Sequence, residues 1–258
     1  MKAAEFTLHR PHRIEEAVDL LAHHGEDAKV LAGGQSLLPI MNMRLAEPAH
    51  LIDITGIDAL HEVAESPASI TYGALTPHMA FEHGLVADAA GGLLRTAAAG
   101  IGYPAIRNRG TLGGSVAHAD SSAEWPVVLS ALGATVHTVS PRGPAVIGVR
   151  DLIVGFFTTA LAPDEIIVAV EVPRLPAGSR WGFHKTARKP GEFAQSIAVA
   201  VHRPDSEQLW LGAAGDTPIR IHPDSDPLEA IGHHGDYTRA IHAVTVRRAL
   251  EATREAHA

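Results

Sequence analysis

Two short glycine motifs carry the residues of this sequence best suited to hold a ligand. The first is Ala32-Gly33-Gly34-Gln35-Ser36 and the second is Thr111-Leu112-Gly113-Gly114-Ser115. Glycine permits a positive φ and a close approach of backbone to ligand, and successive exposed N–H groups in such turns bind anions. Serine and threonine hydroxyls add donors. Either motif alone is typical of an ordinary strand-to-helix turn, but the two together could clamp a diphosphate from two sides.

The common nucleotide and hydrolase motifs are missing. The sequence contains no GxGxxG, no GK[ST] and no GxSxG. A Rossmann dinucleotide site is therefore disfavoured, and a P-loop and the simplest serine hydrolase are excluded.

A small polar cluster follows the second motif. His118, Asp120 and Glu124 could in principle bind a metal ion or perform acid–base chemistry. They lie on one local segment without a distant third ligand, so hydrogen bonding to loop backbone or to sugar hydroxyls is favoured. The chain's 17 histidines show no HExxH motif and are interpreted as solvated surface residues. The sequence predicts neither a metal site nor a catalytic residue.

The first motif lies within a predicted β-α-β-α-β unit. Apolar or alternating stretches predict strands, and helical spacing of apolar residues predicts two helices, the first ending at Gly25. The expected strands are residues 4–9, 28–32 and 50–54, and the expected helices are 13–24 and 37–45.

The second motif lies in a longer segment, with turn residues across 101–126. Thr76-Pro77 is typical of a helix start, with threonine as N-cap and proline at N1. The other helices are expected at 87–99 and 123–132, and the strands at 60–64, 69–75, 134–139, 145–150 and 165–172.

A third pattern begins after Pro173. Residues 180–187, 196–202 and 208–212 predict an antiparallel sheet, and 236–256 a closing helix. The stretch 215–236 is rich in proline, glycine and aspartate and is expected to be a loop.

Composition narrows the class of protein. The absence of cysteine excludes disulfides, thiolate zinc sites and cysteine-ligated iron–sulfur clusters on this chain. The net charge of −8 argues against nucleic-acid binding. No apolar run approaches the roughly 18–20 residues of a membrane span, and the start lacks the apolar stretch of a signal peptide. We expect a cytoplasmic protein.

Three segments resemble the flavin-binding medium subunit of molybdenum hydroxylases. They are AKVLAGGQSLLPIMNMRLAEPAHLIDI, IGYPAIRNRGTLGGSVAHADSSAEWPVVLSALGATV and GFHKTARKPGEFAQSIAVAV. The similarity covers roughly residues 1–202. It is nearest to the carbon monoxide dehydrogenase type and more distant to the xanthine dehydrogenase domain. It implies an α+β, PCMH-type FAD-binding fold, with subdomains at 1–55 and 56–174 and a small α+β domain with an antiparallel sheet at 175–258.

The resemblance also implies roles for residues. FAD would be bound non-covalently, with Ala32, Gly33, Gly34, Gln35 and Ser36 in one diphosphate loop and Thr111, Gly113, Gly114 and Ser115 in the other. Glu124 would hydrogen-bond ribityl or ribose hydroxyls, and Ile167 would contact the cofactor or be a plain core residue. Lys185 would lie near the isoalloxazine edge, where a cation favours the reduced anion, or be a surface lysine.

Two departures from the family pattern concern the C-terminal part. The stretch between LWLGAAGDTPIRI and YTRAIHAVTVRRALEA looks abridged. Phe193 stands where some relatives have a tyrosine beside the flavin, which could alter the reaction with the electron acceptor.

The function implied is electron transfer by a flavoprotein subunit. A small iron–sulfur subunit would deliver electrons from a large molybdenum-cofactor subunit, and FAD would pass them to NAD, oxygen or a quinone. The alternatives are a stand-alone PCMH-fold flavoenzyme with its own small-molecule substrate and, more weakly, a binding protein with empty glycine loops.

Overall fold

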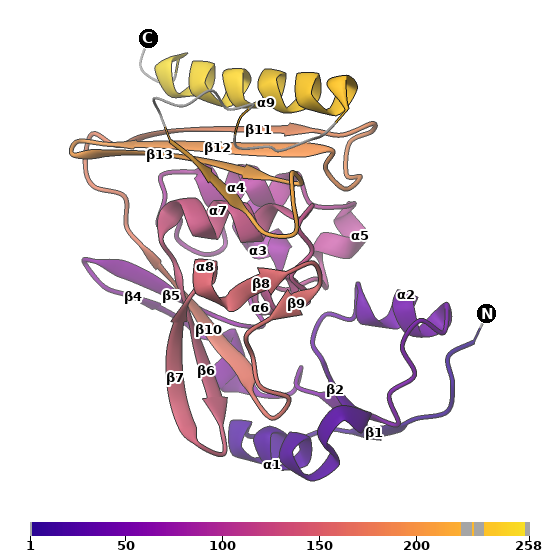
Figure 1. Cartoon of the computed structure of the whole chain (residues 1–258). Coiled ribbons are helices and arrows are strands. Elements are labelled where there is room, and N and C mark those ends of the chain that lie inside the picture. The colour runs from indigo at the N-terminus through magenta and orange to yellow at the C-terminus, as the bar shows by residue number, and fades with distance from the viewer. Residues whose placement is uncertain (1, 223–228, 230–234, 256–258) are drawn as a thin grey trace.

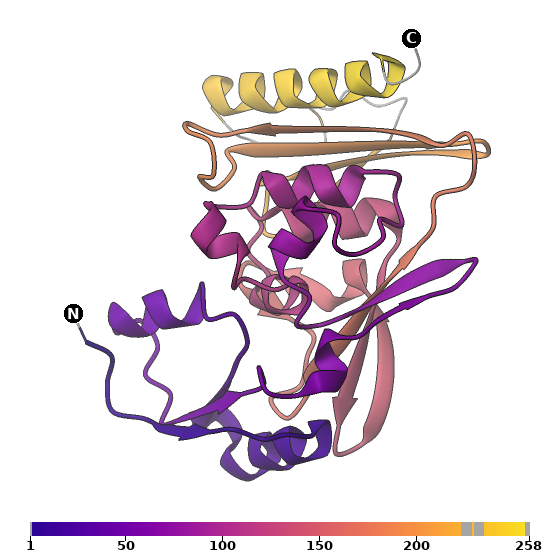
Figure 2. The ribbon, with the colours of Figure 1, turned by 180° about the vertical axis from the view of Figure 1, so that it is seen from behind.

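The computed structural model describes residues 2–222, 229 and 235–255. Three main sheets follow one another along the chain, with most helices packed between the second and the third (Figures 1 and 2). This arrangement confirms the α+β class. Within the described residues, no helix is long and apolar enough to cross a membrane.

The first sheet belongs to a small N-terminal unit. Its three parallel strands have the order β1-β3-β2, and helices connect them: β1 (Thr7–His9), α1 (Ile14–His24), β2 (Ala28–Leu31), α2 (Leu37–Asn42) and β3 (His50–Asp53). Helix α1 buries Ala17, Val18 and Leu21 in the cluster that contains Ile52 of β3. Gly25 ends this helix at a φ of 56°, as the sequence predicts. A short 3-10 turn (Gly25–Asp27) then leads into β2.

The second sheet is antiparallel and has the order β4-β5-β10-β6-β7. A 3-10 turn (Asp58–His61) precedes it, and a two-stranded sheet accompanies it. The strands are β4 (Val63–Glu65), β5 (Ser69–Gly73), β6 (Thr135–Ser140), β7 (Gly143–Gly148), β10 (Ile166–Pro173), and the separate pair β8 (Ile153–Gly155) and β9 (Thr158–Thr159). The helices are α3 (His78–Glu82), α4 (Leu93–Ala99), α5 (Pro104–Arg107), α6 (Leu112–His118), α7 (Glu124–Leu132) and α8 (Val149–Leu152). Every residue of α7 is buried.

The third sheet is sandwiched between helices. Its antiparallel strands run in chain order, with α9 on one face and α4 and α7 on the other (Figure 1). Ile197, Val199 and Val201 of β12 join the main core, whereas Ala198 and Ala200 pack with α9. Alternate residues of this one strand therefore pack into two different hydrophobic clusters, one on each face of the sheet. The elements are β11 (Arg180–Thr186), β12 (Ser196–Arg203), β13 (Ser206–Gly212), β14 (Ile219–Ile221) and α9 (Asp236–Glu255).

Several local predictions are wrong. Residues 87–99 are helical only from Leu93, because Gly91 and Gly92 have φ values of 60° and 98°. Pro77, not Thr76, precedes α3, and the Thr76 hydroxyl donates to the Gly73 carbonyl instead of capping the helix.

The remaining differences are elements that the sequence pattern did not reveal. The turn-rich stretch 101–126 contains α5 and α6. Strand β14 lies in the expected loop 215–236, of which residues 223–228 and 230–234 lie outside the described part of the chain. Residues 58–61 form a 3-10 turn, so the expected strand 60–64 starts only at Val63. The subdomain boundaries at 55/56 and 174/175 stay predictions.

Candidate functional site

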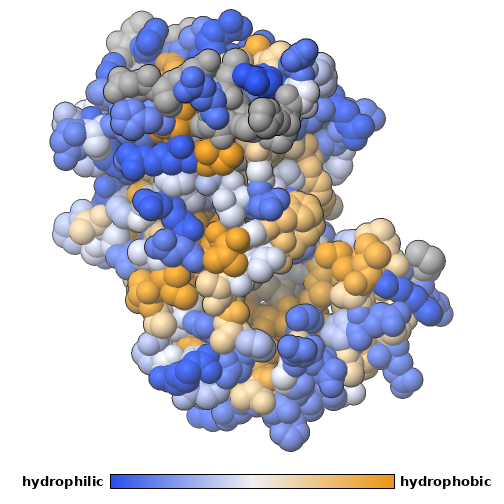
Figure 3. Space-filling model, viewed as in Figure 1, coloured by the Kyte–Doolittle hydropathy of each residue, from blue (hydrophilic) through white to orange (hydrophobic). Residues whose placement is uncertain are grey.

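A cavity of about 840 Å³ opens between the N-terminal unit and the rest of the molecule. Figure 3 shows the surface hollowed there. Its volume lies within the roughly 300–1,000 Å³ of ligand pockets. All the site residues expected from the sequence line this cavity: Ala32, Gly33, Gly34, Gln35, Ser36, Thr111, Gly113, Gly114, Ser115, Glu124, Ile167 and Lys185.

The first glycine motif (residues 32–36) offers unpaired donors to the cavity. It leaves β2 and turns at Gly34, whose φ is 73°. The backbone N–H groups of Gly33, Gly34, Gln35 and Ser36 donate to no acceptor in the described part of the chain. Four unpaired N–H groups in a row at a cavity wall form the kind of nest that binds an anion. The first motif thus has the N–H donors that the sequence predicts, and the binding of a diphosphate to them stays a prediction.

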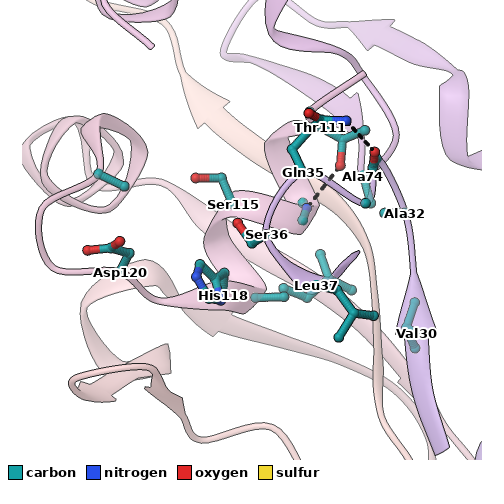
Figure 4. A pocket seen from close by; sticks show the side chains of 18 of the residues that line it. Val30, Ala32, Gln35, Ser36, Leu37, Ala74, Thr111, Ser115, His118 and Asp120 are labelled. Carbon is teal, nitrogen blue, oxygen red and sulfur yellow. Dashed lines mark hydrogen bonds between the residues drawn. The ribbon is translucent and has the colours of Figure 1, made fainter. Parts of the chain in front are cut away.

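Close backbone packing explains why the other glycine of this motif, Gly33, cannot carry a side chain. A Cβ on Gly33 would overlap the carbonyl oxygen of Arg109, and a Cβ on Gly114 would lie 3.7 Å from the Cβ of Ala32. The two motifs are therefore direct neighbours. In Figure 4, Gln35, Ser36 and Leu37 lie beside the helix that carries Thr111, Ser115 and His118.

The second glycine motif (residues 111–115) does not form a nest. Thr111 is the N-cap of α6, and its Oγ1 accepts from the Gly114 N–H at 3.1 Å. The Gly113 N–H donates to Ala74 and the Ser115 N–H to Thr111. Neither glycine has a positive φ. The prediction of exposed N–H donors is thus wrong for this motif, because a capped helix consumes them.

Gly113 and Gly114 instead let this helix pack closely. A Cβ on Gly113 would lie 2.6 Å from the Cβ of Ala74, and one on Gly114 would lie 2.8 Å from the Thr111 hydroxyl. What the second motif presents to the cavity is mainly the Ser115 side chain, labelled in Figure 4.

Glu124 and Lys185 form a buried ion pair at the cavity. Lys185 Nζ lies 2.6 Å from Glu124 Oε1 and also donates to the Gly100 carbonyl at 3.0 Å. The two side chains are 5% and 10% exposed, so Lys185 is not a solvated surface lysine. Burial raises the pKa of the Glu124 carboxyl, and the Lys185 ammonium opposes this rise.

Ile167 is both a core residue and a cavity residue. It is 5% exposed, belongs to the main hydrophobic cluster and lines the cavity. The register of β10 against β6 shifts between Ile167 and Ala169, which is the local irregularity of a bulge. The two interpretations of this residue are therefore compatible.

His78 is a cavity residue that sequence reasoning missed. It is 4% exposed, and its Nδ1 accepts from the Trp125 indole N–H at 3.1 Å. In the neutral ring the proton is therefore on Nε2. Burial, with a smaller effect of the Arg107 cation, lowers the pKa of His78 to about 4. Only the fold brings His78 beside Trp125, so no local sequence signal identifies it.

Arg107 secures one rim of the cavity. It makes a two-point contact with Glu82, at 2.6 Å and 2.8 Å, and donates to the carbonyls of Ile101 and Gly102. The guanidinium holds the pKa of Glu82 below its ordinary value. Ile101 and Gly102 line the cavity, so this buried arginine fixes the loop that shapes it.

Asp120, in the polar cluster after the second motif, stabilises its own loop. Asp120 Oδ1 accepts from the backbone N–H and the hydroxyl of Ser122, which agrees with the expected loop-stabilising use. The His118 ring lies 4.7 Å from the Phe157 ring.

Phe193 lines the cavity and is 67% exposed, so an aromatic face is accessible at the rim of the cavity.

Comparison with known proteins shows what this geometry is similar to. Residues 4–175 match the family described as "FAD binding domain in molybdopterin dehydrogenase". The chain is 38% identical over 251 residues to the 6-hydroxypseudooxynicotine dehydrogenase complex subunit alpha of Paenarthrobacter nicotinovorans, covering 94% of this chain and 84% of that protein. It is 36% identical over 201 residues to the carbon monoxide dehydrogenase medium chain of Afipia carboxidovorans, covering 78% and 70%.

A solved structure has the same fold. Carbon monoxide dehydrogenase from Hydrogenophaga pseudoflava, in a form that lacks the Mo-pyranopterin moiety of the molybdenum cofactor, matches with a TM-score of 0.92 at 30% identity. The match covers 99% of each chain.

Proposed function

The chain belongs to the family of FAD-binding domains in molybdopterin dehydrogenases, and from this membership we propose that it binds FAD in the cavity between its N-terminal unit and the rest. It serves as the flavoprotein subunit of a molybdenum hydroxylase-type oxidoreductase. It receives electrons from iron–sulfur clusters of a partner subunit and passes them to an external acceptor.

One observation carries the assignment of FAD to this cavity. The first glycine motif presents four N–H groups, from Gly33 to Ser36, that have no acceptor among the described residues, at the wall of a cavity large enough for a dinucleotide. A diphosphate satisfies such donors, whereas an apolar ligand would leave them without partners. The residues present therefore fit FAD.

The second motif has a different part in this site. Its capped helix packs against the first motif, and the Ser115 hydroxyl adds a donor to those of the nest. The first motif thus supplies most of the diphosphate contacts, and the second positions it.

The Glu124–Lys185 ion pair forms a further part of the cavity wall. Lys185 and Glu124 neutralise one another and hold β11 against the start of α7. Glu124 offers carboxylate oxygens to sugar or ribityl hydroxyls, and the Lys185 ammonium stabilises negative charge in its surroundings. Ile167 contributes apolar surface. FAD, when bound, supplies the redox chemistry, and these residues bind and orient it.

The proposed partners are compatible with the composition of this chain. It contains no cysteine, so an iron–sulfur cluster held by thiolates has to lie on another subunit. A small iron–sulfur subunit and a large molybdenum-cofactor subunit complete the enzyme.

Purification of the strep-tagged chain from its native host tests the proposal. We expect two further subunits to co-elute, with molybdenum and iron in the complex and one FAD per copy of this chain. Removal of the partners should leave FAD on the chain and remove both metals. A chain that elutes alone, and whose flavin a small organic substrate reduces, would indicate a stand-alone flavoenzyme instead.

A further inference from the structure

Three histidines converge in the N-terminal unit, away from the glycine motifs. His9 lies on β1, His24 is the last residue of α1, and His50 begins β3. Each offers a ring nitrogen, and the three nitrogens lie within 4.8 Å of one another. All three residues are partly buried.

The topology brings together residues that are far apart in the sequence. Strands β1 and β3 are parallel neighbours, and His9 Nε2 lies 3.0 Å from His50 Nδ1 although 41 residues separate them. The end of α1 places the His24 ring against the His50 ring, with centroids 3.7 Å apart. Because no two of these histidines share a helix face, the expectation of scattered surface histidines overlooked the cluster.

The ring nitrogens of the cluster suit a metal ion, because each of the three imidazoles can offer one lone pair to a shared centre. Neutral imidazole is the form that binds metal ions.

We propose that His9, His24 and His50 bind a divalent transition metal ion of the zinc type. Imidazole nitrogens suit Zn²⁺, Cu²⁺ and Ni²⁺, and three histidines with one open position make a complete zinc site. A Zn–N distance of about 2.0–2.1 Å in a tetrahedral site places the nitrogens about 3.4 Å apart. His9 Nε2 and His50 Nδ1, which share a hydrogen bond at 3.0 Å, are already near this separation, and the stacked His24 ring would have to turn to complete the set.

The bound ion would join three elements of one small unit. It links the end of α1 to β1 and β3, directly before Gly25 and Glu26, which line the cavity. The N-terminal unit would then be held together by a metal as well as by its apolar cluster.

The test uses the full chain, purified without a histidine tag, treated with chelator and titrated with Zn²⁺ by calorimetry. We expect one Zn²⁺ per chain. His24→Ala and His50→Ala should weaken binding by about tenfold or more, because loss of a residue that only supports a ligand already costs about that much. His23→Ala is the matched control, since His23 is the exposed neighbour on the same helix. It should bind Zn²⁺ as the unaltered chain does.

Two results would overturn the proposal. One is the absence of stoichiometric Zn²⁺ binding by the unaltered chain. The other is equal binding by all three variants, which would mark an adventitious site. If a variant fails to fold, the absorption spectrum of the unaltered chain with Co²⁺ decides. We expect the bands of a tetrahedral site with nitrogen ligands. The octahedral spectrum of the aqueous ion alone would contradict the assignment.

Discussion

The ammonium of Lys185 lies 2.6 Å from the carboxylate of Glu124, and this contact ties the C-terminal sheet to the wall of the cavity. Lys185 belongs to β11 and Glu124 is the first residue of α7. Since both side chains are almost fully buried, neither charge can be solvated by water when the other is removed. The C-terminal sheet therefore takes part in shaping the cavity.

Lys185→Met should strongly destabilise the chain. It leaves the Glu124 carboxylate buried without a cation, which costs about 3–5 kcal/mol in comparable pairs. Denaturant unfolding of the variant measures this loss. Glu124→Gln combined with Lys185→Met should recover part of it, because no unpaired charge remains. Strictly additive losses in the double variant would show that the two groups do not interact.

His78 should make stability depend on pH below neutrality. Its folded pKa of about 4 lies below the ordinary 6.5, so the folded chain resists protonation. The stabilisation is complete above pH 6.5 and is lost as the pH falls toward 4. The contribution of His78 to the free energy of unfolding falls by roughly 3 kcal/mol between pH 6.5 and pH 4.

Unfolding free energies of the unaltered chain and of His78→Gln between pH 7 and pH 4 check this prediction. Glutamine keeps an acceptor for the Trp125 indole but does not titrate in this range. We expect a shallower pH dependence in the variant. Identical slopes would mean that His78 titrates near its ordinary value.

Denaturation of the protein by acid or heat should release FAD from the chain as the unmodified cofactor. The chain contains no cysteine that could tether the flavin. The measurement is the flavin absorbance of the supernatant after precipitation. Yellow colour retained in the washed pellet would indicate a covalent link, with His78 and His118 as the cavity histidines to examine first.

Much of the fold is encoded locally and was predictable. The apolar stretch at residues 196–202 and the glycine at position 25 predicted a strand and a helix end that the structure contains. The second glycine motif was harder, because small residues suggest a turn until Thr111 is seen to cap a helix. The cap and the close packing of Gly113 on Ala74 depend on tertiary contact.

The residues that line the cavity were predictable as a set, whereas the part of each residue in cofactor binding stays a prediction. All expected residues line the cavity, yet the sequence could not say which motif keeps its N–H groups unpaired. His78, Arg107 and the histidine cluster were missed for one reason. Their partners lie far away in the sequence, so no local period marks them.

Gly33→Ala should deprive the chain of FAD. The added Cβ would overlap the Arg109 carbonyl, so the first motif has to move away from the segment that leads into the second. Gly56→Ala is the matched control, because its Cβ would meet nothing closer than 3.8 Å. The FAD-to-protein ratio after gel filtration, with circular dichroism to verify folding, is the measurement. Equal ratios in the two folded variants would exclude the first motif from FAD binding.

The most direct test of diphosphate recognition compares the affinities of the flavin-free chain for FAD and for riboflavin, which lacks the diphosphate and the adenosine, and then repeats the comparison in the glycine variants. Two or more charge-assisted hydrogen bonds from the Gly33–Ser36 nest, each contributing about 1.5–3 kcal/mol, predict that FAD binds at least about 100-fold more tightly. The preference should shrink in Gly33→Ala and persist in Gly56→Ala. Equal affinity for both flavins in the unaltered chain would contradict the assignment of the diphosphate to this motif.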